Sequence, residues 1–503
     1  MQLFKDIEKK LSTHEPSYWM PGSFDLRIWS QKYVIPNRDN ISVFHTKVRS
    51  RMADKTITDV NELSPKEKKR VEKIIEQAYN NIKKREMLII QRSIGTHTKQ
   101  GIKFRIYLPK DFPQLGFMAH RNFFDCASDK EVEVTTINIP DFPKQMVLVD
   151  PKTNITFVLG SDYYGELKMS LLRMAMNIAR EKNNSLGLHA GSKVYWVKNT
   201  KKKMIKRGVL IFGLSGTGKT TITTINHGLK YPERIRIRQD DINIMDKKTF
   251  CAGTERNFYI KTDNVLEQRS LLPAATSKTT IIENVPVKYG GYAFDDIEFC
   301  PNGRAIVSRY AIPHTDAKVD LDKVDIIFFN TRRFDIPIVG RLISPEQAAT
   351  FFMLGESTQT SAGTEDKSQI GKPMRVVGFD PFIIKPLYKN GQRFYEILKK
   401  NPHVKVYVVN TGKVGGIDKG TDIKPDDTAK SILEIIRGGV EWKYDPTIGY
   451  DIPTKIPGLD LKKFDPYEKY PKDEYKKIMK NLRKDRMKYM EQFPELTFVK
   501  FTK

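Results

Sequence analysis

The stretch GLSGTGKT at residues 213–220 constrains this chain more than any other. It fits the pattern G-x-x-x-x-G-K-[ST], in which backbone N–H groups surround nucleotide phosphates and the lysine reaches the outermost ones. The apolar run at 208–213 predicts a buried strand, and the following KTTITTI predicts a helix whose N-terminus favours anions. The order of strand, glycine-rich loop and helix therefore predicts a nucleotide-binding α/β unit.

Within the loop, Lys219 is expected at the β and γ phosphates, and the Thr220 hydroxyl on the Mg²⁺ that accompanies the nucleotide. The predicted phosphate-binding residues are Gly213, Leu214, Ser215, Gly216, Thr217, Gly218, Lys219, Thr220 and Thr221. Because such loops serve ATPases, GTPases and kinases alike, the motif predicts nucleotide binding and leaves the reaction open.

Length and composition indicate a soluble protein with more than one domain. The chain has 503 residues, of which 39% are hydrophobic, and it holds no apolar stretch long enough to span a bilayer. Its start, MQLFKDIEKKL, lacks a secretory apolar core, so the cytoplasm is the expected location and no membrane partner is expected. The three cysteines lie far apart, which argues against a disulfide framework or a zinc ribbon.

The net charge of +26 would attract nucleic acid, anionic surfaces or anionic metabolites. The densest basic runs are 198–207 and 474–490. The first predicts a solvated hairpin turn, and the second an amphipathic helix with a charged outer face. Neither run is interleaved with aromatic residues as in single-strand binders, so no nucleic-acid partner is expected.

Helix and strand patterns alternate along the chain. Ser64 and Pro65 begin a predicted helix in SPKEKKRVEKIIEQAYNNIKKR, and a second helix is predicted in YYGELKMSLLRMAMNIAREKNN with a stripe of Met and Leu. Predicted strands are EMLIIQRSI, IKFRIYL, VEVTTINI, QMVLV, ITFVLG, IRIRQDDINIM, VDIIFFN, FIIKPL and VKVYVVNTG. We expect two closely packed α/β domains at 1–200 and 201–465, with a basic helical extension at 466–503.

Two features indicate a metal site. Asp240 and Asp241 follow the strand RIRIRQ, where folds with a phosphate-binding loop hold a metal against the γ-phosphate. His189 lies between small residues in GLHAG, just before a strand. A histidine and an aspartate together suit Mn²⁺ better than Mg²⁺ alone.

Three arginines lie near glycine or turn residues, namely Arg51, Arg304 and Arg341. A set of guanidinium forks is what a small dicarboxylate and a transferred phosphoryl group require.

Taken together, these features resemble the ATP-type phosphoenolpyruvate carboxykinases over residues from about 45 to about 460. The segments that carry the resemblance, in order, are LSPKEKKRVEKIIEQ, YYGELKMS, GLHAG, FGLSGTGKTT, RQDDIN, GTERNFYIK, NTRRFDIPIVGRLISPEQA, SAGTE and YVVNTG. The resemblance implies a two-domain α/β fold with a P-loop mononucleotide-binding domain and an active site in the interdomain cleft.

The resemblance also implies roles for individual residues. Arg51 and Tyr163 would line the oxaloacetate site, and Arg304 and Lys168 would contact the reacting groups. The second metal would lie on His189 and Asp241, with Lys168 and Thr220 completing the metal contacts. The remaining nucleotide contacts would be Lys261 and Thr428, toward the base, and Arg341.

The sequence departs from the family pattern at three places. Where the family has two consecutive lysines, the second of them a metal ligand, this chain has Lys168 and Met169. A shift of one residue in the alignment would place Lys168 at the ligand position. The motif around Arg51 is reduced, and Arg49 is the alternative. The family's arginine near adenine falls on or beside Gly420.

The implied reaction converts oxaloacetate and ATP to phosphoenolpyruvate, ADP and CO₂, in gluconeogenesis or anaplerosis. It needs Mg²⁺ with ATP and a Mn²⁺ or second Mg²⁺ that acts as a Lewis acid. Because water must be kept from the enolate, a mobile lid is expected, and 355–372 is its candidate. We expect a monomer or a small homo-oligomer.

Two other functions stay open at this point. Met169 motivates a diverged P-loop kinase of the same fold, which would bind ATP without oxaloacetate-dependent turnover. The charge of +26 motivates a nucleic-acid-binding NTPase, whose hydrolysis DNA or RNA would stimulate. The absence of a recognisable nucleic-acid module places the second well behind.

Overall fold

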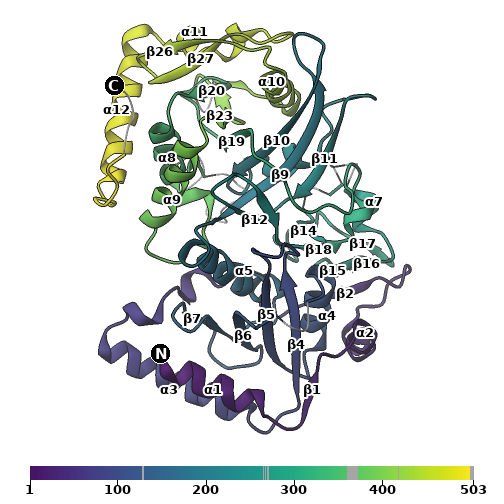
Figure 1. Ribbon diagram of the computed structural model, residues 1–503. Coiled ribbons are helices and arrows are strands. Elements are labelled where there is room, and N and C mark those ends of the chain that lie inside the picture. Colours follow the sequence, from purple (N-terminus) through teal and green to yellow (C-terminus); the bar gives the residue numbers. More distant parts are fainter. Residues whose placement is uncertain are drawn as a thin grey trace. The chain divides into compact units, whose positions relative to one another are not determined.

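The protein is described from a computed structural model (Figure 1). The structure describes residues 1–498 except 127–129, 264, 267, 269–270, 360–371 and 417–418. The chain forms two compact units: the first is Met1–Asn183 with Ala252–Pro313, and the second is Asn184–Cys251 with His314–Lys503. Each compact unit is assembled from two separate stretches of the chain. The consecutive domains 1–200, 201–465 and 466–503 stay a prediction.

The first unit contains a mixed sheet of seven strands among its described residues. In spatial order these are β1 (Ser17–Trp19), β4 (Met87–Ile94), β5 (Ile102–Pro109), β6 (Val134–Ile139), β8 (Ile155–Leu159), β7 (Met146–Asp150) and β3 (Thr56–Ile57). The five strands predicted between residues 86 and 160 are thereby confirmed. Nearly every residue of these five is buried, as is typical of strands covered on both faces.

The helices of the first unit are α1 (Gln2–Ser12), α2 (Ser23–Ser30), α3 (Pro65–Ile82), α4 (Pro113–Asn122), α5 (Tyr164–Glu181) and the short α7 (Leu272–Ala275). Single 3-10 turns occur at Gln31–Tyr33, Ala53–Lys55, Val60–Glu62 and Arg309–Ala311. The predicted start of α3 is confirmed, because the Ser64 hydroxyl accepts from the Glu67 N–H in a capping box. Figure 1 shows α1 alongside α3, and their apolar faces share one core.

Helix α5 is buried far beyond the predicted stripe of Met and Leu. Every residue from Tyr164 to Arg180 is buried, including Lys168 and Arg173. A charged side chain in such a place costs free energy unless it is paired. The polar partners of α5 are therefore part of the fold, and they reappear in the candidate site below.

A second, four-stranded sheet of the first unit has the order β14 (Phe258–Lys261), β18 (Arg304–Val307), β15 (Ile281–Glu283) and β2 (Ser42–Phe44). A small hairpin pairs β16 (Val287–Lys288) with β17 (Gly291–Tyr292). In this sheet Arg304 lies opposite Lys261 on one side and Glu283 on the other.

The second unit contains a larger sheet, with ten strands among the described residues. In spatial order these are β13 (Cys251–Gly253), β12 (Ile242–Met245), β9 (Leu186–Lys198), β10 (Met204–Gly213), β19 (Ile326–Thr331), β23 (Lys405–Asn410), β20 (Val339–Leu342), β27 (Tyr450–Lys455) and β26 (Glu441–Asp445), and β11 (Arg234–Gln239) pairs with β9. Strands β9 and β10 form an antiparallel hairpin, which confirms the hairpin turn predicted in the basic run. Strands β10, β19 and β23 are parallel, so their carboxyl ends share one edge.

The helices of the second unit are α6 (Lys219–Thr224), α8 (Pro345–Leu354), α9 (Tyr388–Lys400), α10 (Pro425–Arg437), α11 (Pro466–Lys469) and α12 (Lys472–Met490), with 3-10 turns at Val377–Phe379 and Leu461–Phe464. Two small two-stranded sheets pair β21 (Glu356–Thr358) with β22 (Pro373–Arg375), and β24 (Lys413–Val414) with β25 (Thr421–Asp422).

The strand predicted in FIIKPL is wrong. Residues 382–387 form turns and coil, although Ile383 and Ile384 are buried. The Asp380 carboxylate accepts from the Phe382 N–H at 2.8 Å and so closes a turn where a ladder would begin. Pro386 has no N–H to donate to a neighbouring strand. Burial alone therefore produced the strand-like pattern.

Helix α12 confirms the predicted amphipathic helix, with one difference. Tyr475, Met479, Leu482 and Met490 join the core of the second unit, and Figure 1 shows α12 beside α8. Arg486, predicted on the charged outer face, is only 4% exposed and forms an ion pair with the buried carboxylate of Glu356 in β21. The burial of a charge on this helix is explained by that partner.

Candidate active site

The predicted phosphate-binding loop connects β10, which ends at Gly213, to α6, which begins at Lys219. Gly216 and Gly218 both have φ of 78°, in the left-handed region that favours glycine. The N–H and hydroxyl of Thr217 both donate to the Leu214 carbonyl, at 3.1 and 2.8 Å. The loop is therefore held in its curved conformation by its own backbone.

The loop lies at the carboxyl ends of the three parallel strands, where open α/β sheets bind ligands. A Cβ at Gly213 would lie 2.3 Å from Thr217 Oγ1, so this position needs glycine. The Thr411 hydroxyl, just after β23, donates to the Thr217 carbonyl at 3.1 Å. The end of β23 thus contributes a hydrogen bond that holds the loop.

The predicted acid pair lies against the loop. The Lys219 ammonium donates to the Asp240 carbonyl at 2.9 Å and lies 3.7 Å from Asp241 Oδ1. The Thr220 hydroxyl donates to Asp240 Oδ2 at 3.2 Å. The structure therefore brings together a lysine, a hydroxyl and two carboxylates at the start of α6.

Asp240 is in an unusual environment for a carboxylate. Burial raises its pKa to about 6, although Lys219 opposes that rise. Its Oδ1 atom is buried and has no hydrogen-bond partner among the described residues. An unsatisfied buried oxygen is costly for a folded protein, so this atom fits a site that receives a cation or a water molecule.

His189 and Asp241 converge in the way that metal ligands do. The Nε2 atom of His189 lies 3.0 Å from Asp241 Oδ1. Its Nδ1 atom lies 2.9 Å from the Phe379 carbonyl, which can only accept, so Nδ1 carries a proton. In the neutral ring the Nε2 lone pair then faces a carboxylate oxygen, an arrangement that a shared cation or a ring proton would relieve. A carbonyl that fixes the histidine tautomer is a common second partner of metal-bound histidine.

Strand pairing sets this geometry. His189 lies in β9 and Asp241 follows β11, and the Ala190 N–H donates to the Asp241 carbonyl at 2.8 Å. Among the described residues, no group of three or more His, Cys, Asp or Glu side chains could hold a metal ion. Further ligands of an ion on His189 and Asp241 would then be of other kinds, such as hydroxyls, an amine, water or the nucleotide.

The first unit holds a separate group of predicted residues around Tyr163. The Tyr163 hydroxyl accepts from Asn302 Nδ2 at 2.9 Å and from Arg304 Nε at 3.3 Å. Arg304 also donates to Asn302 Oδ1 at 2.8 Å. Asn302 thus orients the predicted arginine and tyrosine together.

Lys168 forms a buried ion pair with Glu255, at 2.9 Å. The Asn122 side chain donates to the same carboxylate oxygen at 2.8 Å. The Lys168 ammonium lies 5.0 Å from the ring centre of Tyr259, and the Arg304 guanidinium lies 5.5 Å from that ring. One aromatic ring therefore holds the two cations that the resemblance assigns to the reacting groups.

Glu283 supports this group from β15. Its carboxylate accepts from the Tyr259 hydroxyl at 2.7 Å and from the Tyr164 N–H, at the start of α5, at 2.8 Å. Burial raises the pKa of Glu283 to about 7, although both hydrogen bonds oppose the rise.

Arg49 and Arg51 differ in their surroundings. The Arg49 guanidinium lies 4.0 Å from the ring centre of Phe299 and donates to the Phe299 carbonyl. Arg51 is half-buried, and the N–H of the next residue, Met52, donates to the buried Glu166 of α5 at 2.8 Å. Met169 is buried as well.

The predicted nucleotide contacts outside the loop lie on three different elements. Lys261 ends β14 and forms an ion pair with Asp263 at 3.0 Å. Arg341 in β20 forms an ion pair with Asp451 at 2.6 Å. Thr428 is buried in α10. The predicted lid, 355–372, falls mostly on residues 360–371, which lie outside the described residues.

Sequence reasoning assigned no role to Glu255, Tyr259, Glu283 and Asn302. Glu255 and Tyr259 lie in the segment GTERNFYIK, and Asn302 is two residues before Arg304, so proximity to quoted motifs was the available signal. Glu283 carries no such signal, because only the register of β15 with β18 places it beside Arg304.

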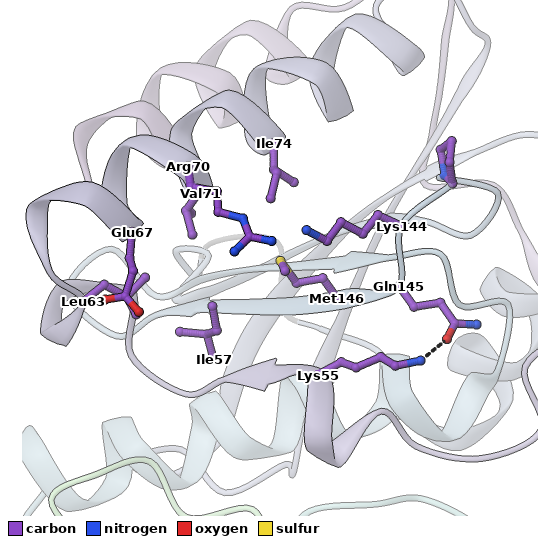
Figure 2. Close-up of a pocket in the computed structure, with 11 residues that line it drawn as sticks. Lys55, Ile57, Leu63, Glu67, Arg70, Val71, Ile74, Lys144, Gln145 and Met146 are labelled. Atoms are coloured by element: carbon purple, nitrogen blue, oxygen red, sulfur yellow. Dashed lines mark hydrogen bonds between the residues drawn. The ribbon is translucent and has the colours of Figure 1, made fainter.

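A pocket of about 570 Å³ in the first unit holds none of the predicted site residues (Figure 2). It is lined by parts of α3, β3 and the segment before β7, with Arg70 and Lys144 pointing into it. The Lys55 ammonium donates to Gln145 at 2.6 Å along its rim. We assign no chemistry to it.

No helix within the described part of the chain is long and apolar enough to cross a bilayer.

Comparison with known proteins identifies the family. The family model for phosphoenolpyruvate carboxykinase matches residues 44–462. The chain belongs to the phosphoenolpyruvate carboxykinase family. It is 37% identical over 501 residues to the phosphoenolpyruvate carboxykinase (ATP) of Aeropyrum pernix, and the alignment covers 98% of both chains.

More distant relatives in the family carry the same description. The phosphoenolpyruvate carboxykinase (ATP) of Fusobacterium nucleatum is 24% identical over 82% of this chain and 79% of its own. That of Thermus thermophilus is 26% identical over 78% of this chain and 70% of its own. Because the alignment with the Aeropyrum pernix protein covers 98% of this chain, it extends beyond residues 44–462 of the family model into both terminal segments.

Proposed function

We propose that this protein converts oxaloacetate and ATP to phosphoenolpyruvate, ADP and CO₂. The observation that carries the proposal is the grouping of Lys219, Thr220, His189 and Asp241 at one edge of the sheet, in a chain of the phosphoenolpyruvate carboxykinase family. Phosphate binding and metal binding meet there, as phosphoryl transfer requires.

The loop would hold the phosphates of ATP by its backbone N–H groups, with Lys219 reaching the outer ones. Without nucleotide, its ammonium donates to the Asp240 carbonyl at 2.9 Å, next to the acid pair. During transfer it would offset charge on the equatorial oxygens of the γ-phosphate.

His189 and Asp241 fit a divalent cation such as Mn²⁺ or Mg²⁺, and Thr220 fits the Mg²⁺ that accompanies ATP. A divalent cation bound there supplies Lewis-acid polarisation of the substrate carbonyl, which favours loss of CO₂. The Phe379 carbonyl fixes the imidazole so that Nε2 presents its lone pair, and β9 keeps it beside Asp241.

On the substrate side, Arg51, Tyr163 and Arg304 would bind the carboxylates of oxaloacetate. Asn302 holds the Tyr163 hydroxyl and the Arg304 guanidinium in one arrangement before substrate binds. Such preorganisation lowers the entropic cost of orienting the substrate.

Lys168 would offset negative charge that develops on the reacting groups. Its ion pair with Glu255 suits a charge contact better than metal ligation, which would need a lone pair on the amine. On this assignment Met169 is a buried apolar residue of α5, and its thioether has no metal to bind.

The test is phosphoenolpyruvate formation from oxaloacetate with Mg²⁺ and Mn²⁺ present, with ATP compared to GTP. The wild type is compared with His189→Ala, and with His403→Ala as a control for loss of an exposed histidine. We expect ATP-dependent turnover that His189→Ala abolishes and His403→Ala leaves unchanged.

Two results would contradict the proposal. Measurable ATP binding without oxaloacetate-dependent turnover would indicate a diverged kinase with another acceptor. Turnover that survives His189→Ala would place the metal elsewhere.

A further inference from the structure

The short helix α6 of the phosphate-binding loop lies directly against β9. Residues 189, 191 and 193 alternate along β9, so they share one face of the strand. At the middle of these positions, a Cβ on Gly191 would lie 2.1 Å from Thr223 Oγ1 in α6. Glycine at this position therefore permits α6 to approach the strand that carries His189.

Lys193 caps the end of α6 from the same face. Its side chain is fully buried, and its Nζ donates to the carbonyls of Ile222 and Ile225 at 2.8 and 2.5 Å. The last carbonyls of a helix lack partners within the helix and form its negative end. Within the described chain no carboxylate forms an ion pair with Lys193, and burial lowers the pKa of its amine well below the usual range, so the two carbonyls hold it by hydrogen bonds.

His227 extends the cluster to a third element. Its Nδ1 atom lies 3.0 Å from the Ala429 carbonyl of α10, which can only accept, so Nδ1 carries the proton. Its Nε2 atom then accepts from the Tyr195 hydroxyl at 2.8 Å and lies 3.3 Å from Lys193 Nζ. Burial lowers the pKa of His227 well below its usual range, so the ring stays neutral.

The hydrogen bonds of Lys193, His227 and Tyr195 join the elements that carry the proposed nucleotide-binding residues. Strand β9 carries His189, α6 carries Lys219 and Thr220, and α10 carries Thr428 next to Ala429. We infer that Lys193 is a positioning residue for the nucleotide, which fixes the end of α6, with His227 and Tyr195 tying α10 to the same strand. The inference rests on the proposed use of a nucleotide at this loop.

Removing the Lys193 amine has a specific expected consequence. In Lys193→Met the carbonyls of Ile222 and Ile225 would lose their partner inside the protein, and they would turn toward water by unwinding the end of α6. Because α6 is six residues long, unwinding would also reach Lys219 and Thr220 at its start. Affinity for the phosphates should fall, while the group around Tyr163 in the first unit is left intact.

The experiment measures MgATP binding by titration calorimetry in the wild type, in Lys193→Met and in Lys198→Met. Lys198 is an exposed lysine of the same strand and serves as the matched control. We expect the Kd for MgATP to rise at least tenfold in Lys193→Met and to stay within twofold in Lys198→Met. Amide hydrogen exchange over residues 214–225 should accelerate only in Lys193→Met.

A kinetic measurement separates positioning from general destabilisation. We expect the KM for ATP to rise in Lys193→Met while the KM for oxaloacetate stays within twofold. If Lys193→Met does not fold, His227→Phe is the second variant: it keeps an aromatic ring but removes the hydrogen bonds to Ala429 and Tyr195. We expect the same pattern, with a rise of about threefold in the Kd for MgATP. Folded variants with unchanged MgATP affinity, or with both KM values raised alike, would overturn the inference.

The outcomes for this inference and for the proposed function are distinct. A wild type that binds MgATP but forms no phosphoenolpyruvate would remove the proposed function, and a weaker MgATP affinity in Lys193→Met would still support the role of Lys193. Equal affinities in the wild type and Lys193→Met would overturn the inference alone. A wild type that does not bind MgATP would overturn both.

Discussion

Glu356→Gln is expected to lower the free energy of unfolding of the second unit by about 3 kcal/mol at neutral pH. Burial raises the pKa of Glu356, but the positive charges of Arg486, Arg333 and Arg375 lower it by more than burial raises it, so the pKa falls to about 2. Compared with the ordinary value of 4.5, this difference is worth about 3 kcal/mol in favour of the folded state. The glutamine would also leave three arginines without the carboxylate they share.

The pH dependence follows from the sign of this change. A carboxyl group whose pKa is lower in the folded protein stabilises it above the unfolded value, and the contribution disappears as pH falls toward the folded value. The difference between the wild type and Glu356→Gln should therefore be complete above about pH 5 and fall below half by about pH 3. Near pH 2 it should be close to zero.

The assay is urea unfolding followed by tryptophan fluorescence. Two of the four tryptophans, Trp196 and Trp442, lie in the second unit, so replacing Trp19 and Trp29 by phenylalanine confines the signal to it. Glu441→Gln is the matched control, because its ion pair with Lys455 is exposed on both sides and should change stability by less than about 1 kcal/mol.

The reasoning is refuted by either of two results. Glu356→Gln could unfold at the same urea concentration as the wild type at pH 7. Alternatively, its deficit could persist undiminished at pH 3, which would mean that the loss comes from packing and not from the ionised carboxylate.

Three further predictions concern the two candidate sites. Asp241→Asn should lower the rate of phosphoenolpyruvate formation about 100-fold or more, and the residual rate should need a higher Mn²⁺ concentration for half-saturation, because a metal ligand has been lost. Glu283→Gln should flatten the pH dependence of the free energy of unfolding. Because the pKa of Glu283 is raised to about 7, its protonated form stabilises the fold at low pH, and about 3 kcal/mol of that stabilisation is lost as pH rises from 4.5 to 7. Urea unfolding of both proteins across this range measures the difference. Gly191→Ala should cost about 1–3 kcal/mol through its overlap with Thr223, and in thermal unfolding Thr223→Ala should relieve it where Thr223→Ser does not.

The sequence predicted those parts of the molecule in which local chemistry decides the structure. The loop around Lys219 follows from its glycines, and the start of α3 follows from Ser64 and Pro65. The acid pair at Asp240 lies where the strand and loop order required it. The roles given to the site residues remain predictions until the experiments above are done.

Contacts between distant segments could not be predicted. Glu255 lies beside Lys168, and Glu283 beside Tyr259, because separate strands and helices bring them together. Arg486 reads as an exposed cation in a basic helix, and nothing near it in sequence indicates its partner in β21. Buried lysines and arginines are the residues for which pattern reasoning fails, since their charge predicts exposure.

The interleaving of the two units has a consequence for biosynthesis. The small sheet of the first unit pairs β2, near the N-terminus, with β15, and β18 follows only after residue 303. The core of the second unit includes Leu496 and Phe498, among the last residues described. The small sheet of the first unit cannot be completed before residue 307 is synthesised, and the core of the second unit not before residue 498, so their apolar faces must stay protected from aggregation over that interval.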